Sequence, residues 1–236
     1  MVLEVIATTV EDAKRAERGG ADRIELISGI LEGGVTPSCG LIDAVVKAVS
    51  IPVNVMVRPH SQSFCYTADD LRVMREDIRV IRESGAAGIV LGALTPQGEV
   101  DTAALEELLA EAEGLDVTFH RAFDEAADQL GAASVLLHYP QVRRILTSGG
   151  QKSALDGAER IADLVRLTAG THLSIMAGSG LTLTTMADVI RSTGATEVHF
   201  GTGVREDGKA QKPVDEAKVA AVKAALHTLM LERPGH

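Results

Sequence analysis

The chain has 236 residues, of which 45% are hydrophobic and 24% charged, and its formal net charge is -10. These proportions are those of a folded globular protein and exclude a disordered or fibrous one. The negative charge argues against a sequence-independent nucleic-acid binder, which would need a basic face. No apolar run is long enough to cross a bilayer, and the N-terminus has no signal-peptide features, so we expect a cytoplasmic protein without a membrane partner.

Short β-branched runs alternate with helix-length amphipathic segments along the whole chain. The predicted strands begin near residues 2, 23, 52, 88, 116, 143, 173 and 197. This alternation is typical of parallel strands joined by helices. Eight such units are the number that closes a barrel. The sequence therefore predicts an α/β protein, a (β/α)8 TIM barrel, as a single domain over residues 1–236.

Helix boundaries are readable at both ends of the chain. Thr9 and Asp12 can cap a first helix that ends at Gly19 and Gly20. A long helix is predicted over residues 68–84, where apolar residues recur at helical spacing. A final amphipathic helix is expected at about 214–231, closing the barrel or supporting a dimer. Residues 205–213, REDGKAQKP, are expected to form a mobile polar loop before it.

The most unusual stretch is TFHRAFD, residues 118–124, where a predicted strand ends in a cluster of ionisable side chains. His120, Arg121 and Asp124 bring a proton donor, a fixed cation and a carboxylate together within five residues. Barrel enzymes place their chemistry at the C-terminal ends of the strands. The cluster therefore indicates a binding or catalytic site.

Strand periodicity sorts polar side chains toward the barrel interior. Alternate residues of a barrel strand face the helices and the interior. One parity is apolar, and the other carries Glu4, Glu25, Asn54, Arg58, Thr118, His120, Glu197 and His199. Buried charges must pair, meet water or hold a ligand. We expect Glu25 to pair with Arg58, and a glutamate to pair with His120 or His199. A purely structural ion-pair network is the alternative.

Glycine-rich turns follow the last strands and favour an anion site. Such turns let backbone N–H groups approach a phosphate or carboxylate, aided by a following helix N-terminus. The candidate anion-binding residues are Ser148, Gly178, Ser179, Gly180, Gly201 and Thr202. All seven lysines lie on predicted helices or loops, which argues against a Schiff-base aldolase. No GKS or GKT phosphate loop and no complete dinucleotide fingerprint occurs.

Several runs of the sequence carry a family resemblance. They are LEVIATTVEDAKRAERGGADRIEL, GGVTPSCG, IPVNVMVRP, DIRVIRESGAAGIVLGAL, VTFHRAFD, RILTSGG and IMAGSGL, in this order from residue 3 to about 200. In these runs the chain resembles the CutC copper homeostasis proteins. The resemblance implies a (β/α)8 barrel, a cytoplasmic homodimer and a copper-related role, but it supplies no reaction. It also carries over Glu25, Arg58, His120, Arg121, Asp124, Ser148 and His199.

The thiols that the resemblance would assign to Cu(I) are missing. Ile6 and Ile27 stand where family members proposed to bind Cu(I) have cysteines. Cu(I) strongly prefers sulfur ligands, so that copper site does not carry over directly. The two cysteines of this chain, Cys39 and Cys65, follow the second and third predicted strands. They are either a substitute pair at the barrel mouth or two unrelated loop cysteines.

Three functions stay open at this point. The first is a copper-binding or copper-handling protein, with a copper ion as partner. The second is a barrel enzyme of unknown reaction that acts on a small phosphorylated or carboxylated metabolite. Its candidate catalytic residues are Glu25, Arg58, His120, Arg121, Asp124 and His199, with the arginines binding the anion, His120 as general acid or base, and Glu25 or Asp124 orienting it. The third is a Zn or Mn site among Glu4, Glu25, His120 and His199.

Overall fold

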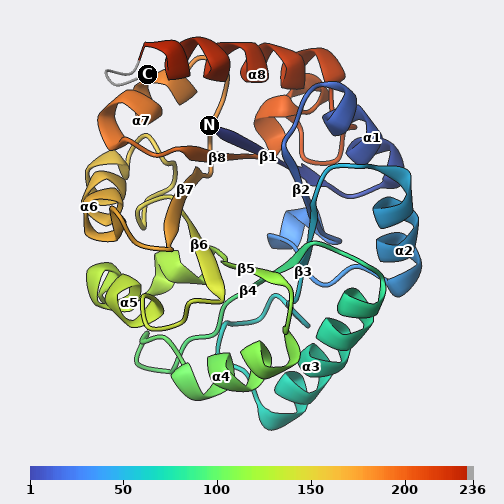
Figure 1. Cartoon of the computed structure of the whole chain (residues 1–236), viewed down its shortest axis with the longest axis vertical. Coiled ribbons are helices and arrows are strands. Elements are labelled where there is room, and N and C mark those ends of the chain that lie inside the picture. Colours follow the sequence, from blue (N-terminus) through green and yellow to red (C-terminus); the bar gives the residue numbers. More distant parts are fainter. Residues whose placement is uncertain (233–236) are drawn as a thin grey trace.

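The structure, a computed structural model, describes residues 1–232 and is a closed barrel of eight parallel strands (Figure 1). Strands pair in chain order, and β8 pairs with β1 to close the ring. The strands are β1 Val2–Ala7, β2 Arg23–Leu26, β3 Val53–Met56, β4 Gly88–Leu91, β5 Asp116–Phe119, β6 Val142–Thr147, β7 Ser174–Gly178 and β8 Glu197–Phe200. Every strand begins within one residue of its predicted start, which confirms the TIM barrel.

The helices form a ring around the strands (Figure 1). They are α1 Val10–Arg18, α2 Cys39–Ala48, α3 Ala68–Glu83, α4 Thr102–Glu111, α5 Gln129–Leu136, α6 Ala158–Thr168, α7 Met186–Thr193 and α8 Glu216–Leu231. In the described part of the chain, four short 3-10 helices lie in loops after the strands, namely η1 Ile30–Glu32, η2 Arg121–Glu125, η3 Thr202–Val204 and η4 Glu206–Gly208. Within residues 1–232, none of the helices is long and apolar enough to cross a membrane.

Local signals explain where the helices begin and end. The Thr9 side chain accepts a hydrogen bond from the backbone N–H of Asp12 and caps α1, as predicted. Thr67 and Asp70 form a reciprocal capping box at the start of α3. The final helix begins at Glu216, capped by Asp215, and runs between α7 and α1 on the outside of the barrel (Figure 1).

The segment that precedes α8 is anchored more firmly than the predicted mobile loop. Arg205 is only 1% exposed. Its guanidinium donates to Asp12 Oδ2 at 3.2 Å and to the backbone carbonyls of Ile6 and Lys212. The expectation for residues 205–213 therefore fails at Arg205, because a buried ion pair fixes the start of the loop against α1.

The sorting of side chains between the two sides of the strands is confirmed. Val5, Ile24, Val55 and Phe119 belong to the apolar core that also contains the inner faces of the helices. The opposite parity fills the barrel interior with buried polar side chains, including Glu4, Glu25, Asn54, Thr118 and His199. Strand alternation alone thus separates an apolar layer between the strands and the helices from an ionisable barrel interior.

A chain of ion pairs occupies the end of the barrel where the strands begin. Arg23 bonds to Glu4 and, at 2.6 Å, to Glu197. Arg144 lies 3.3 Å from Glu197 and 2.6 Å from Asp116. Acids and bases therefore alternate around this end, where most barrels pack branched apolar residues. The network leaves the opposite end as the place for a ligand.

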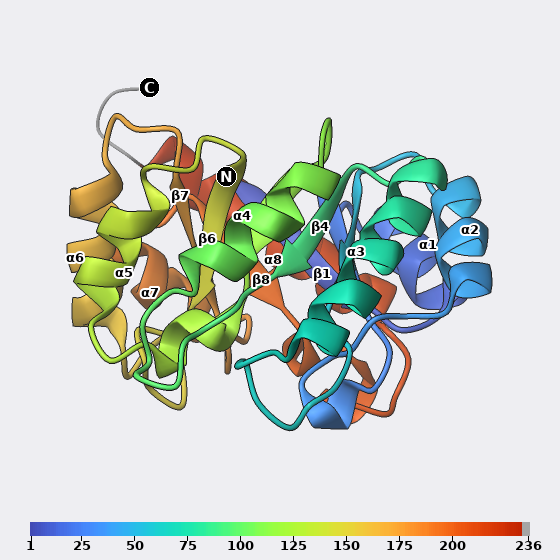
Figure 2. The same ribbon diagram turned by 90° about the horizontal axis from the view of Figure 1, so that it is seen from below.

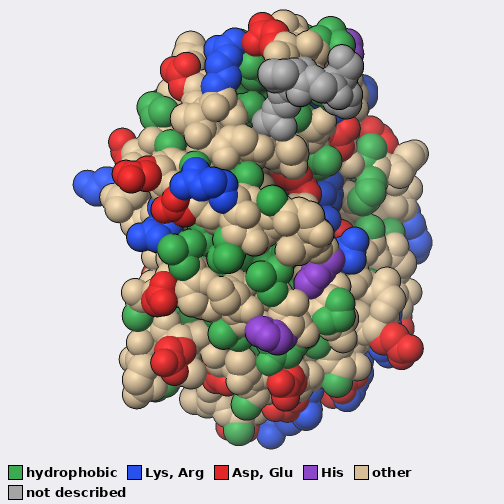
Figure 3. Space-filling model, turned by 60° about the vertical axis from the view of Figure 1, so that its left-hand side comes forward, with side chains coloured by type: hydrophobic (Ala, Val, Ile, Leu, Met, Phe, Trp, Pro, Cys, Tyr) green, Lys and Arg blue, Asp and Glu red, His purple; other side chains and the backbone are tan. Residues whose placement is uncertain are grey.

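The loops that follow the strands gather at the lower edge of the barrel in side view (Figure 2). Here η1 and the loop before α3 project beyond the strands. The outer face on the side of α5 to α7 interleaves acidic, basic and hydrophobic side chains (Figure 3). No single sign of charge dominates that face.

Candidate functional site

A cavity of about 520 Å³ opens at the C-terminal ends of the strands. A volume of this size suits a small molecule. Ten of the predicted site residues line it: Glu25, Arg58, His120, Arg121, Asp124, Ser179, Gly180, His199, Gly201 and Thr202. Ser148 and Gly178 are not among its lining residues. The structure therefore brings together most of the residues that the sequence singled out.

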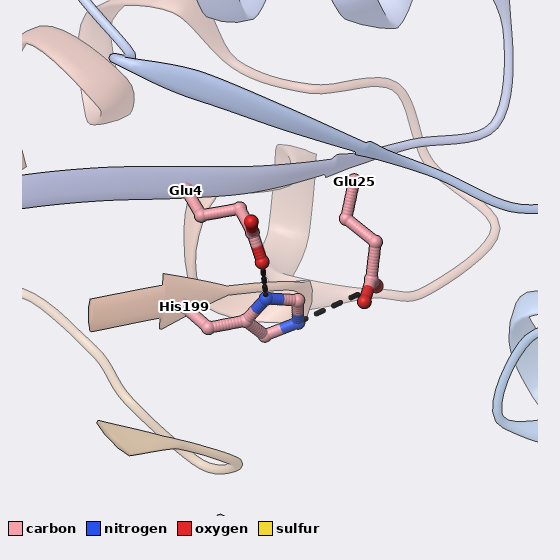
Figure 4. Close-up of side chains that lie close together, drawn as sticks. All are labelled: Glu4, Glu25 and His199. Carbon is pink, nitrogen blue, oxygen red and sulfur yellow. Dashed lines mark hydrogen bonds and ion pairs between the residues drawn. The ribbon is translucent and has the colours of Figure 1, made fainter. Parts of the chain in front are cut away.

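Glu4, His199 and Glu25 form a buried row from β1, β8 and β2 (Figure 4). The Nδ1 atom of His199 lies 2.8 Å from Glu4 Oε1, which confirms the predicted pairing of a glutamate with this histidine. The other ring nitrogen, Nε2, lies 3.7 Å from Glu25 Oε2. Glu25 Oε1 is buried and has no hydrogen-bond partner among the described residues. Glu25 thus retains an unused oxygen beside the cavity.

The two carboxyl groups of this row, Glu4 and Glu25, differ strongly in pKa. Burial raises the pKa of Glu25 to about 7, only partly opposed by His199. Burial acts in the same direction on Glu4, but Arg23 and the hydrogen bond from His199 outweigh it and hold the pKa of Glu4 at about 2. Burial alone would lower the pKa of His199, yet Glu25 and Glu4 raise it. Glu4 is therefore a fixed anion, whereas the pKa of Glu25 lies near neutral pH and that of His199 is raised above its ordinary value.

This ionisation predicts a pH-dependent effect of Glu25→Gln on stability. The pKa of Glu25 is about 7 in the folded state against an ordinary value of 4.5. Between these pH values the folded protein therefore binds a proton that the unfolded chain has released. The stability that this proton contributes is complete below about pH 4.5 and is lost as the pH rises through 7. Relative to wild type, Glu25→Gln should gain about 1–3 kcal/mol of unfolding free energy between pH 4.5 and 8.

Urea unfolding of both proteins across this pH range measures the difference. Glu83→Gln, which removes an exposed carboxyl group at the end of α3, serves as the control and should show no such trend. A difference between Glu25→Gln and wild type that stays constant with pH would contradict the assignment.

His120 follows β5 directly and is a neutral hydrogen-bond donor. Its Nδ1 accepts a hydrogen bond from the Ala122 N–H at 3.1 Å. Burial, aided by the charge of Arg58, lowers the pKa of His120 to about 3. A neutral ring whose Nδ1 accepts must carry its proton on Nε2. That atom is buried and has no partner within residues 1–232. Gly92 makes room for the ring, since a Cβ there would lie 2.6 Å from Nδ1.

Arg58 does not pair with Glu25, so the predicted ion pair is wrong. Its Nη1 donates instead to the backbone carbonyls of Glu32 and Gly34, at 3.0 and 3.1 Å. The guanidinium carbon lies 4.7 Å from the centre of the Phe64 ring. Because Arg58 lies beyond the end of β3, its side chain reaches the loop after β2 rather than the strand residue beside it. It therefore shapes the rim of the cavity.

Asp124 organises the loop after β6. Its carboxylate accepts hydrogen bonds from Thr147 Oγ1, from the backbone N–H groups of Ser148 and Gly150, and from Arg121 Nε at 2.7 Å. The Ser148 hydroxyl is also used internally, since it donates to the Gln151 carbonyl at 2.6 Å and accepts from Arg121. Asp124 and Ser148 therefore position Arg121 and the loop, and neither has an oxygen free of protein partners.

The glycine-rich turns border the cavity without the helix N-terminus that was expected beside them. Ser179 and Gly180 both have positive φ angles, 79° and 68°, and Ser179 Oγ donates to the Lys152 carbonyl. Helix α7 begins only at Met186, several residues beyond the turn. Thr202 begins the short 3-10 helix η3. Any anion contact on this side therefore comes from the turns themselves.

Sequence reasoning missed Phe64, Arg23 and Arg144. Phe64 lies against both Arg58 and the His120 ring, whose centre is 5.1 Å away. One signal was available, because Phe64 is one of only four phenylalanines and lies in a polar loop. Arg23 shares the strand parity of Glu25 and could have been found by it. Arg144 was harder, since it stands next to the exposed Arg143 and the sequence alone does not say which of the two arginines faces the interior.

Comparison with known proteins identifies the family. The profile of the CutC family matches residues 1–204. This chain belongs to the CutC family. It is 44% identical to the human "Copper homeostasis protein cutC homolog", over 84% of this chain and 72% of that protein. It is 41% identical to a CutC protein of Photobacterium profundum, over 89% of this chain and 83% of that one.

Solved structures agree with the CutC assignment. The crystal structure of CutC from Streptococcus agalactiae matches with a TM-score of 0.80 and 32% identity, covering 84% of this chain and 97% of that one. A phosphoribosyl anthranilate isomerase from Thermococcus kodakaraensis gives a TM-score of 0.62 at 18% identity, covering 95% and 98% of the two chains. The second likeness shows the barrel fold alone.

In this CutC family member neither cysteine lines the cavity. Cys39 and Cys65 are exposed and free, and no cysteine is among the described residues that line the cavity. Ile6 and Ile27 do line it. The interior of the mouth therefore offers carboxylate and imidazole groups but no thiolate.

Proposed function

We propose that this CutC family member takes part in copper homeostasis in the cytoplasm. The observation that supports this role is the family match over residues 1–204, together with the 44% identity to the human copper homeostasis homologue. Copper would be the cargo of such a protein. A copper-handling role in the cell is distinct from coordination of a copper ion inside the barrel. The donor groups that line the cavity decide only whether such coordination can occur.

The cavity does not suit Cu(I). Soft Cu(I) takes thiolate or thioether ligands. Ile6 and Ile27 have no donor atom, and the only sulfur among the described residues that line the cavity is the single thioether of Met56, which is too few ligands to hold the ion. The Glu4, Glu25 and His199 row suits a harder ion by ligand type, but among the described residues only Glu25 Oε1 of the row's carboxylate oxygens is buried without a partner. Glu4 bonds to both His199 and Arg23. Direct Cu(I) binding therefore falls to the exposed Cys39 and Cys65.

Two measurements test the copper proposal. In a host strain without its own CutC gene, expression of this chain should restore copper tolerance in a growth assay; equal growth with and without the chain would contradict the role.

In a competition with a Cu(I) chelator, the Cys39→Ser, Cys65→Ser double variant should lose any Cu(I) affinity, and Ser63→Ala should keep it. Affinity that survives the double variant would contradict binding at these thiols.

The geometry of the mouth also favours a second candidate, a site for a small phosphorylated or carboxylated molecule. The observation behind it is the buried, unpartnered Nε2–H of His120 beside Arg58 at the cavity wall. A buried donor without a partner is costly unless a ligand or water accepts from it. Arg58 has a similar unpartnered atom, its buried Nε, in the described part of the chain.

Two of the acidic residues at the mouth, Asp124 and Glu25, do not cancel these donors. Asp124 is neutralised by Arg121 and its other hydrogen bonds. Glu25 holds a proton over much of the range below pH 7. Arg58 and the neutral His120 therefore present donors that an anion can accept from, which is the arrangement expected of an oxyanion site.

A further inference from the structure

We infer that the barrel mouth catalyses proton transfer at carbon, with Glu25 as the base and the neutral His120 as the donor to the oxygen where negative charge develops. The inference rests on the second candidate function above, a site for a small anion. The substrate class is a small carboxylated or phosphorylated molecule with a C–H bond next to a carbonyl group. The argument starts from the two groups of the cavity wall that have unused atoms.

Glu25 has the geometry of a general base. It lies on β2, is 2% exposed and lines the cavity. One of its oxygens, Oε1, has no partner among the residues described. A base works best when its pKa lies near the working pH, and burial places the pKa of Glu25 at about 7. An ordinary surface glutamate would be too weak a base for this step.

His199 and Glu4 orient Glu25 and provide a group with which it can exchange a proton. Glu4 stays ionised and holds His199 through Nδ1, so His199 Nε2 is turned toward Glu25 (Figure 4). A histidine held in this way can take the proton that Glu25 has accepted, or return one to it. His199 and Glu4 are therefore positioning residues, since in this scheme they act on the substrate only through Glu25.

His120 supplies the complementary group. Its tautomer is fixed by the Ala122 N–H, which leaves Nε2–H as a donor at the cavity wall. A neutral imidazole of low pKa polarises a carbonyl group without giving up its proton. Phe64 packs on the ring at 5.1 Å and Gly92 leaves it space, so the donor is held before any ligand binds. Such preorganised donors stabilise the charge that develops in an enolate.

The proposed step is balanced without any added reactant. The carboxylate of Glu25 forms an O–H bond as the substrate C–H bond breaks. The electron pair of that bond moves into the new carbon–carbon double bond, and the carbonyl oxygen takes the negative charge next to His120 Nε2–H. Return of the proton to the same carbon regenerates the substrate, and if the proton held by Glu25 has first exchanged with solvent, that carbon carries a solvent hydrogen. No oxidation occurs.

Solvent exchange tests this inference. Wild-type protein is incubated in D2O with pyruvate, 2-oxoglutarate and dihydroxyacetone phosphate, and the replacement of C–H by C–D is followed by proton NMR. We expect at least one probe to exchange faster than without protein. Exchange should fall about 100-fold or more in Glu25→Gln and in His120→Ala. Glu83→Gln, which changes an exposed carboxyl group at the end of α3, should exchange as wild type does.

Calorimetric titration of the same three probes separates this inference from the anion site itself. Binding without exchange would overturn the proton-transfer inference and leave the anion site standing. Exchange that is unchanged in Glu25→Gln would overturn the role of Glu25. Absence of binding by all three probes would overturn both proposals. Far-UV circular dichroism and thermal unfolding of each variant show that lost exchange is not lost folding.

Discussion

Replacing Arg23 by methionine is expected to lower the free energy of unfolding by about 3–5 kcal/mol. Arg23 bonds to Glu4 and Glu197 inside the barrel, and its side chain is only 8% exposed. Removing the cation leaves two buried carboxylates that keep only weaker compensation, from His199 beside Glu4 and from Arg144 at 3.3 Å from Glu197. Methionine fills a similar volume, so the lost free energy of unfolding comes from the missing charge rather than from a cavity.

An exposed arginine provides the control for this prediction. Arg18 pairs with Glu11 and Glu216 on the surface, and Arg18→Met should cost no more than about 1 kcal/mol. Adding Glu197→Gln to the Arg23→Met variant should restore part of the loss, because one of the two buried negative charges disappears. Urea unfolding measures all three variants. Equal losses for Arg23→Met and Arg18→Met would contradict the buried network.

The second large effect is expected on anion binding when Arg58 is replaced. Arg58→Ala should weaken the binding of phosphate or 2-oxoglutarate about 10- to 100-fold, the value of one charge-assisted hydrogen bond of roughly 1.5–3 kcal/mol. The Arg58→Ala, His120→Ala double variant should lose measurable binding. Titration calorimetry at low salt gives the affinities.

Two further variants separate charge from loop support. Arg58 also holds the carbonyls of Glu32 and Gly34, so its removal can disturb η1. Arg58→Lys keeps the charge and should retain part of the affinity, although lysine lacks the planar fork of arginine. Arg191→Ala, on the outside of α7, is the control for net charge and should bind as wild type does. Undiminished binding by the double variant would contradict the anion site.

Strand periodicity made much of this fold predictable from the sequence. β-Branched runs located all eight strands, and alternation placed Glu4, Glu25 and His199 inside the barrel. These features depend on residues next to each other in the chain. The pairing of His199 with a glutamate followed, because β8 lies beside β1 in a closed barrel.

The remaining details depend on contacts that alternation does not encode. Parity gives the side of the sheet but not how far a side chain extends, so Arg58 was assigned to Glu25 although it reaches carbonyls of the loop after β2. The role of His120 depends on one backbone N–H, that of Ala122, which fixes its tautomer. Ser148 was a candidate for ligand contact, but the fold of its own loop turns the hydroxyl toward Gln151 and Asp124.

The most direct test of the anion site is a crystal structure of the protein purified without added metal and soaked in phosphate. The account predicts tetrahedral density in the cavity, within hydrogen-bond distance of Arg58 and of Nε2 of His120. Phosphate absent from the mouth, or a metal ion bound between Glu25 and His199 in its place, would contradict it.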